Sequence, residues 1–308
     1  MSGAPEVTFS LPPALAEHAR AWLDAGGGEA APPRDASTVM LLREGEDGGG
    51  LEVFVLRRAA TMSFAASAYV FPGGGVDGRD AAADLPWAGP SPAQWAGRLA
   101  APTQEQAREL VVAAARELFE ECGVLLAGPD ERSVVCDLTA PEWDAARAAL
   151  VAKEISFAQF LIERGLVLRS DLLRALDHWI TPEFEPRRFD TRFFVAVLPA
   201  GQVPDDDCTE ADHVRWVRAA DLLAERRAGA ATLLPPTELC LQRLAGEQPF
   251  GEGDRPWDGR ASSLLDVLDD GRPLPVVLPR AVDTPDGVRV VRQWASVEPP
   301  ARKAGGTP

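Results

Sequence analysis

Three glutamates within five residues are the strongest candidates for chemistry in this chain of 308 residues. Glu117, Glu120 and Glu121 follow the spacing i, i+3, i+4, so on a helix their carboxylates share one face. Ionised carboxylates this close repel one another, and a hard divalent cation with oxygen ligands relieves that repulsion. The spacing therefore predicts a metal-binding face, although glutamates on a helix are more often a solvated surface.

The helix that must position these glutamates has a second, apolar face. That face comprises Val111, Ala114, Ala115, Leu118 and Cys122. Thr103 is predicted to cap the N-terminus of the helix, with Gln106 completing a capping box. Gly123 is predicted to end the helix as a C-terminal glycine. One side of the helix would thus pack on the core while the other side presents the acids.

A glycine-rich turn precedes this helix. Residues 69–71 form an apolar run that Pro72, Gly73 and Gly74 follow, which is typical of a strand ending in a tight loop. Together with the segment Arg-Glu-Leu-Phe-Glu-Glu-Cys-Gly-Val at 116–124, this turn resembles the Nudix hydrolase family. The box of that family reads Gly, five residues, Glu, seven residues, then Arg-Glu-aliphatic-any-Glu-Glu-any-Gly-aliphatic. Residues 116–124 match every defined position of its second half.

The first half of the box is interrupted. Gly74 best matches the box glycine, but 42 positions separate it from Arg116 where the family has 14, so 28 extra residues lie inside the motif. Counting back eight residues from Arg116 gives Arg108 where the family has its first Glu. Glu105 and Glu109 are the acids nearby, and the role stays open between them. An interrupted box resembles the subgroup that includes the peroxisomal coenzyme A diphosphatase of animals.

The resemblance implies a role for each matched residue. The implied catalytic residues are Glu117, Glu120, Glu121 and Glu210. The implied ligands of Mg²⁺ or Mn²⁺ are Glu117, Glu120, Glu121 and the backbone carbonyl of Gly73. The general base would be one of the helix glutamates or Glu210 from a later acidic loop, where Asp212 competes with it. Arg116 would hold the glutamates, and Gly74 and Gly123 would shape the backbone around them.

Three arginines are predicted to contact an anionic substrate, because a polyanion needs local positive charge in a chain with a formal net charge of −16. They are Arg57, Arg58 and Arg188. The first two end an apolar run before a loop, and Arg188 follows Pro186 in a rigid basic turn. Each could instead be a surface charge, and Asp190 could pair with Arg187 or Arg188.

The resemblance implies hydrolysis of the phosphoanhydride bond in a nucleoside diphosphate derivative. A metal ion that bridges two phosphates neutralises them and lowers the pKa of a bound water. Coenzyme A or acyl-coenzyme A is the first expectation for the substrate, and ADP-ribose, NADH or a nucleotide sugar is the alternative. A non-catalytic Nudix-like ligand-sensing module is a further alternative, against which the intact acidic half of the box and the lack of a basic DNA-binding segment both count.

Composition argues against several classes of partner. The net charge of −16 argues against a nucleic-acid-binding surface, which needs clustered Lys and Arg. The four cysteines have no C-x-x-C spacing, which fits a reducing compartment. No membrane span or export signal is evident, so the expectation is a cytoplasmic protein with a small-molecule partner. A homodimer is left open.

The resemblance also implies the architecture, an α/β protein with the Nudix fold, in which a mixed β-sheet is sandwiched between helices with helical insertions. Residues 1–36 are expected to form an N-terminal helix and flexible linker, residues 37–246 the Nudix hydrolase domain, and residues 247–308 a C-terminal extension. Within the domain, residues 78–102 would interrupt the box. Residues 141–176 would form a helical insertion, which could be a lid or a dimer contact.

Periodicity and turn residues place the individual elements. Helices are predicted at residues 13–24, 104–122, 219–227 and 236–245. Strands are predicted at residues 37–43 and 51–58 as a hairpin, and at 133–137, 178–180, 188–197 and 214–217. A strand pair is predicted around Val276 and residues 288–294. Trp87 and Trp95 of the 78–102 insertion are expected to cover an edge of the core.

Overall fold

The computed structural model describes residues 8–45, 48–59, 66–205, 211–250, 257–269 and 271–292. Its α-helices are α1 (Pro13–Asp24), α2 (Pro92–Leu99), α3 (Gln104–Cys122), α4 (Pro141–Val151), α5 (Phe157–Glu163), α6 (Ala219–Arg227), α7 (Pro235–Leu244) and α8 (Ala261–Leu268), with 3₁₀ turns η1 (Gly78–Ala81) and η2 (Ser170–Leu172). Its strands are β1 (Thr8–Ser10), β2 (Arg34–Glu44), β3 (Leu51–Arg58), β4 (Ala68–Val70), β5 (Gly73–Gly75), β6 (Trp87–Ala88), β7 (Ala127–Gly128), β8 (Val167–Arg169), β9 (Leu173–Ile180), β10 (Phe189–Val197), β11 (Ala211–Arg218), β12 (Thr232–Leu233), β13 (Val276–Val277), β14 (Arg280–Thr284) and β15 (Gly287–Val291). No helix within the described ranges is both long and apolar enough to cross a membrane.

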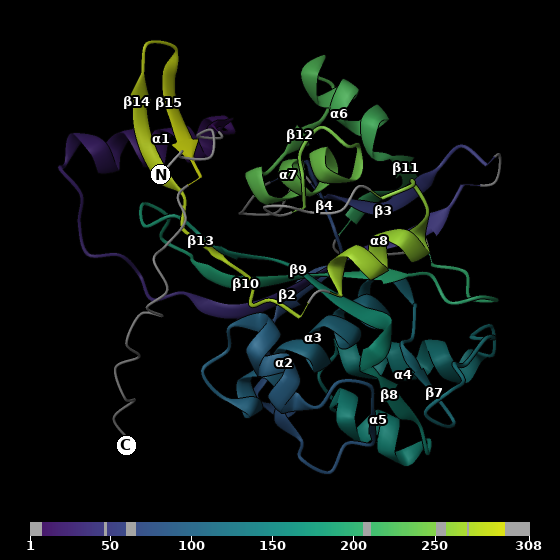
Figure 1. Cartoon of the computed structure of the whole chain (residues 1–308). Helices are drawn as coiled ribbons and strands as arrows, with labels where there is room; N and C mark the ends of the chain where they lie inside the picture. Colours follow the sequence, from purple (N-terminus) through teal and green to yellow (C-terminus); the bar gives the residue numbers. More distant parts are fainter. Residues whose placement is uncertain are drawn as a thin grey trace, which may run out of the picture.

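A nine-stranded mixed sheet forms the centre of the molecule. Its main path runs β12-β4-β3-β2-β10-β9-β13, with β11 paired to β3 and β5 paired to β2. β10 lies parallel to β2, whereas β2 and β3 are antiparallel and form the predicted hairpin. Helices α2 and α3 lie on one side of this sheet and helices α6 and α7 on the other (Figure 1). The α/β sandwich expected for the Nudix fold is therefore confirmed.

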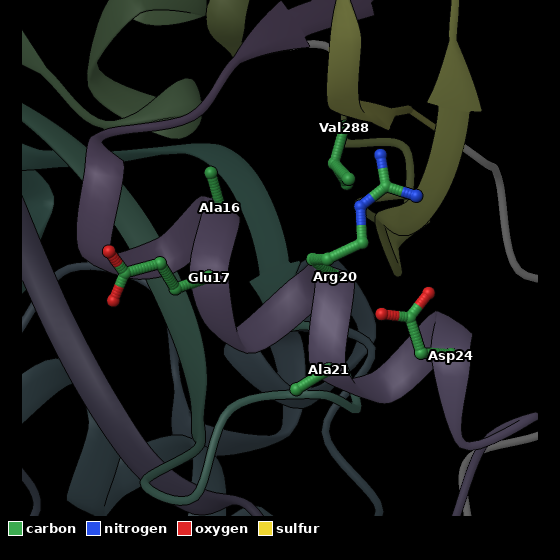
Figure 2. A pocket seen from close by; sticks show the side chains of 6 residues that line it. All are labelled: Ala16, Glu17, Arg20, Ala21, Asp24 and Val288. Atoms are coloured by element: carbon green, nitrogen blue, oxygen red, sulfur yellow. The ribbon is translucent and has the colours of Figure 1, made fainter.

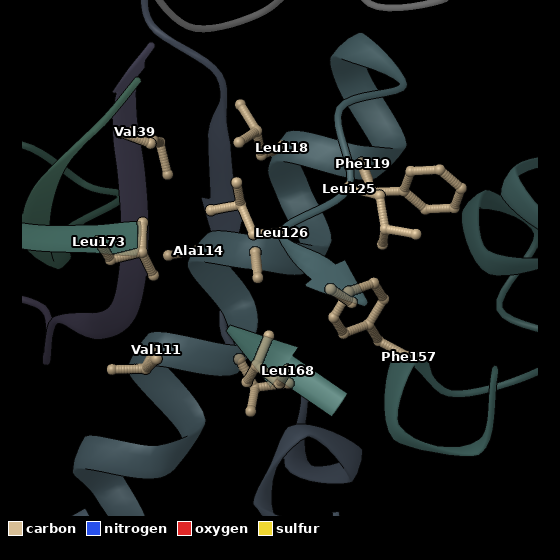
Figure 3. Packing of buried hydrophobic residues seen from close by; sticks show 14 of the residues in the cluster. Val39, Val111, Ala114, Leu118, Phe119, Leu125, Leu126, Phe157, Leu168 and Leu173 are labelled. Carbon is tan, nitrogen blue, oxygen red and sulfur yellow. The ribbon is translucent and has the colours of Figure 1, made fainter. Parts of the chain in front are cut away.

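The two faces of strand β2 contact different helices. Val39 and Leu41 belong to the hydrophobic cluster that contains Leu118 and the rest of the apolar face of α3 (Figure 3). Met40 and Leu42 belong to the cluster that β2 shares with α6, α7 and α8. Successive side chains of a strand point to opposite faces, so a strand covered on both sides reads as a continuous apolar run. β2 is therefore buried on both faces, and α3 packs on one of them.

Most predicted elements are present. The helices predicted at residues 13–24 and 219–227 coincide with α1 and α6, and the helix predicted at 236–245 is α7, one residue earlier. The strands predicted at residues 188–197 and 214–217 lie within one to three residues of β10 and β11. β2 begins at Arg34, before the predicted start at residue 37, because it pairs with β10 from its first residue.

Other element predictions are wrong because they depend on partners distant in the sequence. Residues 133–137 are not a strand; the strand in this region is β7, which pairs with β8. The helices of the 141–176 segment end at Glu163, and β8 and the start of β9 occupy the remainder. The predicted strand pair near the C-terminus does not form, since β13 joins β9 while β15 joins β14 and β1.

The 78–102 insertion starts with η1 and continues through β6 to α2. Trp95 of α2 is fully buried and meets the ring of Phe194 edge-on, with a centroid distance of 5.9 Å. Trp87 is partly buried, and its indole Nε1 donates to the carbonyl of Pro90 at 2.7 Å. Both tryptophans therefore cover the core edge, as predicted, and the insertion packs on the sheet.

The two terminal segments pack together beside the main sheet. β15 pairs with β1 and β14, and α1 lies against this three-stranded sheet (Figure 1). The side chain of Arg20 on α1 donates to Asp283 on β14 at 2.7 Å. An open hollow of about 430 Å³ lies at this contact and is lined by Ala16, Glu17, Arg20, Ala21, Asp24 and Val288, whose side chains are drawn in Figure 2. None of the α3 glutamates lines it.

Candidate active site

Helix α3 carries the three glutamates, and both of its ends are capped. The hydroxyl of Thr103 accepts from the backbone N–H of Gln106 at 3.1 Å. The predicted reciprocal half of a capping box is wrong, because Gln106 Nε2 instead donates to both carboxylate oxygens of Asp35. At the other end, Gly123 has φ of 68° and donates to the carbonyl of Phe119 at 2.9 Å, as a C-terminal glycine does.

The glycine bend lies directly against two of the glutamates. The backbone N–H of Gly73 donates to Glu121 Oε2 at 2.8 Å. A Cβ atom at Gly74 would lie 2.4 Å from Glu117 Oε1, so a larger residue there would displace that carboxylate. β5 is held in this place because Gly73 pairs with Thr38 of β2. The structure therefore brings the bend and the acidic face of α3 together.

Arg116 connects the acids to one another. Its Nη1 donates to Glu117 Oε1 at 2.8 Å and to Glu120 Oε2 at 3.1 Å. Its Nη2 donates to the carbonyl of Gly75 at 2.8 Å, which ties the helix to the glycine bend. Burial alone would lower the pKa of Arg116, but the charges of the surrounding carboxylates outweigh it and raise that pKa, so the guanidinium stays protonated. This agrees with the supporting role expected for Arg116.

A fourth acid, Asp80, completes the cluster. Its carboxylate is 1% exposed and accepts from Arg116 Nε at 3.2 Å. η1 positions it through a capping box, in which the N–H of Asp77 donates to Asp80 Oδ2 at 3.0 Å. Five residues separate Gly74 from Asp80, which is the spacing between the glycine and the first acid of the Nudix box.

The position of Asp80 corrects the expectation for the first acid of the box. If the extra residues preceded this acid, it would lie near Arg108, whereas the structure places the extra residues after it. Arg108 donates to the carbonyl of Ala82 at 3.4 Å and is a link to the insertion. Counting forward from Gly74, in place of backward from Arg116, would have found Asp80 in the sequence.

Burial sets the protonation of the cluster. Burial raises the pKa of Glu117 to about 7, an effect that Arg116 opposes and Glu120 reinforces. Burial also raises the pKa of Glu120 and of Asp80, again against the attraction of Arg116. One guanidinium is thus insufficient to keep these carboxylates as acidic as they are in water.

The donor set of the cluster fits a hard divalent cation. The four carboxylates of Asp80, Glu117, Glu120 and Glu121 surround a single guanidinium and a glycine bend, so the cluster has excess negative charge. Within the part of the chain that the structure describes, no three acidic, histidine or cysteine side chains already form a metal-binding group. Glu117 and Glu120 do not converge on one point because both carboxylates are paired with Arg116. A cation would supply the charge that this cluster lacks.

The end of α4 and the segment that follows it form one wall of the site. A cavity of about 20 Å³ lies between α3, η1 and this segment. It is lined by Asp77, Arg79, Asp80, Arg116, Glu120, Leu150, Lys153, Ile155, Ser156 and Phe157. From α4 itself, Arg147 Nε donates to the carbonyl of Glu120 at 2.8 Å. The helical insertion is thus part of the site.

Two of the predicted substrate-binding arginines lie on β3. Arg57 Nε donates to Asp212 Oδ1 at 2.7 Å, with both side chains partly exposed. Arg58 pairs through its backbone with Ala211 of β11. Glu210, the predicted acid of the later loop, lies outside the described residues. Asp212, its competitor in the sequence, is engaged by Arg57.

The guanidinium of Arg188 is occupied by hydrogen bonds to backbone carbonyls and is not open to a ligand. Its Nε donates to the carbonyl of Thr181 at 2.9 Å and its Nη1 to the carbonyl of Ala31 at 2.7 Å. The residue is 8% exposed, and burial lowers its pKa. The pairing of Asp190 with Arg187 or Arg188 is not observed, because Asp190 pairs with Arg192 of its own strand β10 and with His178 of the neighbouring strand β9.

Comparison with known proteins identifies the family. No family model matches the chain. A solved NUDIX hydrolase from Alicyclobacillus acidocaldarius superposes with a TM-score of 0.60 at 29% sequence identity, covering 77% of this chain and 96% of that one. The chain belongs to the Nudix hydrolase family. The fold is the Nudix fold, and the cluster built on α3 occupies the second half of its box.

Two curated relatives support the same family. The Nudix protein described here is 28% identical to putative nudix hydrolase 7 of Caenorhabditis elegans over 193 residues, which cover 63% of this chain and 55% of the relative. It is 25% identical to acyl-coenzyme A diphosphatase NUDT19 of Xenopus laevis over 238 residues, covering 65% of this chain and 61% of the relative. The chain therefore spans less than two thirds of the length of each of these two relatives.

Proposed function

We propose that this Nudix protein hydrolyses the phosphoanhydride bond of a nucleoside diphosphate derivative in a reaction that depends on a divalent metal. The observation that carries the proposal is the contact network of Arg116, which joins Asp80, Glu117 and Glu120 beside the glycine bend. Nudix hydrolases act on acid anhydrides, and the acidic half of their box is complete here. An intact acidic cluster supports catalysis over a purely ligand-sensing role.

The residues that would hold Mg²⁺ or Mn²⁺ are Glu117, Glu120, Glu121 and the backbone carbonyl of Gly73. When bound, such an ion would neutralise the diphosphate and make a water molecule more acidic. The chain's own groups do the positioning. Arg116 orients Glu117 and Glu120, and the N–H of Gly73 orients Glu121.

We propose that the general base is one of the helix glutamates or Glu210. Arg116 Nη1 contacts Glu117 Oε1 at 2.8 Å, which orients this carboxylate as a metal ligand.

Coenzyme A or an acyl-coenzyme A is the substrate that we favour within this class. Two observations support it, namely the interrupted Nudix box and the similarity to a relative named acyl-coenzyme A diphosphatase. ADP-ribose, NADH and nucleotide sugars share the diphosphate and use the same acidic cluster equally well. The choice among them depends on contacts with the rest of the substrate.

A panel assay tests the proposal. Purified protein with Mg²⁺ or Mn²⁺ is incubated with coenzyme A, acyl-coenzyme A, ADP-ribose, NADH and a nucleotide sugar, and the phosphate-bearing products are separated. We expect turnover of at least one compound, coenzyme A first, and loss of that turnover with a chelator. Binding of these compounds without any hydrolysis would instead identify a ligand-sensing module.

A further inference from the structure

Lys153 occupies a backbone position that glycine normally takes. At the end of α4, the N–H of Lys153 donates to the carbonyl of Leu150 and the N–H of Glu154 to the carbonyl of Ala149, both at 2.9 Å. This pair of bonds is a Schellman motif with Lys153 at its left-handed position. Lys153 has φ of 59°, a value that residues with a Cβ atom rarely adopt. A lysine kept in an unfavourable conformation suggests a function.

This lysine is held at the edge of the acidic cluster. It lines the cavity that Asp80, Arg116 and Glu120 also line. Arg79 Nη1 donates to the backbone carbonyl of Lys153 at 3.1 Å, which ties the end of α4 to η1. The side chain of Lys153 is exposed, so its ammonium can reach a ligand from solvent.

The other cations that line this cavity are engaged by acids. Arg116 contacts Asp80, Glu117 and Glu120, and Arg79 forms a two-pronged pair with Asp77. Among the described residues, Lys153 forms no direct ion pair, and its charge interacts with that of Glu120 only through space. A polyanionic substrate that approaches an acidic cluster in an acidic protein needs a cation that is not already neutralised. Lys153 meets this need.

We propose that Lys153 is a substrate-binding residue whose ammonium contacts a non-bridging oxygen of the substrate diphosphate. An ammonium is a compact point charge with three donors, which suits phosphate oxygens. The inference rests on the proposed function, because it takes the diphosphate to lie at the acidic cluster. It adds the helical insertion, absent from the Nudix box, to the residues that contact substrate.

A lysine near the C-terminus of a helix can also have a purely structural role, because its positive charge interacts favourably with the last helix carbonyls. Substitution by glycine separates the two. Lys153→Gly relieves the left-handed backbone, so a structural role predicts unchanged or higher thermal stability with unchanged kinetics. A substrate-binding role predicts the same stability with weakened substrate binding. Ala100, at φ of 49° after α2 and outside the cavity, offers the matched control Ala100→Gly.

The experiment measures steady-state kinetics, thermal unfolding and calorimetric binding for the full-length protein, Lys153→Gly, Lys153→Arg and Ala100→Gly. The ligands are coenzyme A and dephospho-coenzyme A, which share the diphosphate and differ in one ribose phosphate. For Lys153→Gly we expect kcat/KM and affinity to fall about 10- to 100-fold for both ligands, the range for one lost hydrogen bond to a charged group. We expect most of the fall to appear in KM. Lys153→Arg should retain most activity, and Ala100→Gly all of it.

Each contrary outcome overturns a defined statement. Wild-type kinetics and affinity in Lys153→Gly would overturn the inference alone. A loss confined to coenzyme A would place Lys153 on the ribose phosphate and overturn the diphosphate contact. A wild-type protein that binds both ligands without turnover would refute coenzyme A as the substrate, while the calorimetric arm would still decide the role of Lys153. A wild-type protein that neither binds nor hydrolyses them would overturn coenzyme A as the substrate and, with it, the proposed contact of Lys153 with its diphosphate.

Discussion

The guanidinium Nε of Arg116 lies 3.2 Å from both carboxylate oxygens of Asp80, a residue 36 positions earlier in the chain. This contact joins the start of the 78–102 insertion to the acidic helix α3. Both side chains are nearly inaccessible, with 11% of Arg116 and 1% of Asp80 exposed. The Nudix box is therefore continuous in space although 28 extra residues interrupt it in the sequence.

Asp80→Asn tests whether this contact is required. We expect the free energy of unfolding to fall by about 1–3 kcal/mol, because the change removes a charged hydrogen-bond acceptor from a buried guanidinium. Activity should fall with it, since Arg116 positions Glu117 and Glu120. Denaturant unfolding and kcat/KM measure the two effects. The control is Glu105→Gln, which changes an exposed acid on helix α3. A larger loss of stability and activity in Glu105→Gln than in Asp80→Asn would refute Asp80 as the first acid of the box.

Glu120→Gln and Glu121→Gln test the metal-binding face. Each change removes a charge but keeps the shape of the side chain, so we expect kcat to fall about 100-fold or more with little change in the melting temperature. The apparent affinity for Mg²⁺, from titration of activity, should weaken as well. Glu163→Gln on α5 is exposed and serves as the control. Near-normal rates in both active-site variants would mean that the site lies elsewhere.

Gly74→Ala should separate activity from folding. The new methyl group would lie 2.4 Å from Glu117 Oε1, the end of a flexible side chain that can move away. We therefore expect kcat to fall at least tenfold, in the range for loss of a positioned catalytic group, with a modest change in stability. Gly75→Ala is the matched control, because no atom lies within 4 Å of the added methyl group. Equal activity of the two variants would show that the orientation of Glu117 is unimportant.

The metal-free protein should lose stability as pH rises because of Glu117. Burial raises its pKa from 4.5 to about 7, so the folded state holds a proton that the unfolded state has released between these values. The stabilisation is complete below pH 4.5 and is lost as pH rises through about 7, and it amounts to at most about 3 kcal/mol. Melting temperatures with chelator from pH 5 to 8 should fall more for wild type than for Glu117→Gln. Parallel curves would contradict this prediction.

Arg188→Gln should destabilise the protein without affecting substrate binding. The change removes donors to the partly buried carbonyls of Thr181 and Ala31, which is expected to cost about 1–3 kcal/mol. KM should stay at the wild-type value, because these contacts occupy the guanidinium. Arg57→Gln removes a solvent-exposed pair and should leave the free energy of unfolding nearly unchanged. A raised KM in Arg188→Gln would contradict this prediction and indicate that Arg188 contacts the substrate.

Local signals in the sequence determined the main elements of the fold. The spacing of Glu117, Glu120 and Glu121, the cap at Thr103 and the terminating Gly123 define α3 from residues within one helix length. The apolar runs of β2 and β3 on either side of a short turn define the hairpin in the same way. The second half of the Nudix box lies within the last turns of α3 and the two residues that follow it, so the sequence was sufficient to recognise it.

Tertiary structure decided what depends on residues far apart. Asp80 lies at the box spacing from Gly74, but only the tertiary structure shows that η1 brings it to Arg116. In the same way, the sequence around Lys153 does not show that this residue lines a cavity together with Glu120. The sequence around Arg188 does not show that its guanidinium donates to backbone carbonyls. Secondary structure follows from neighbours in sequence, whereas burial, charge pairing and pKa depend on what packing places around a side chain.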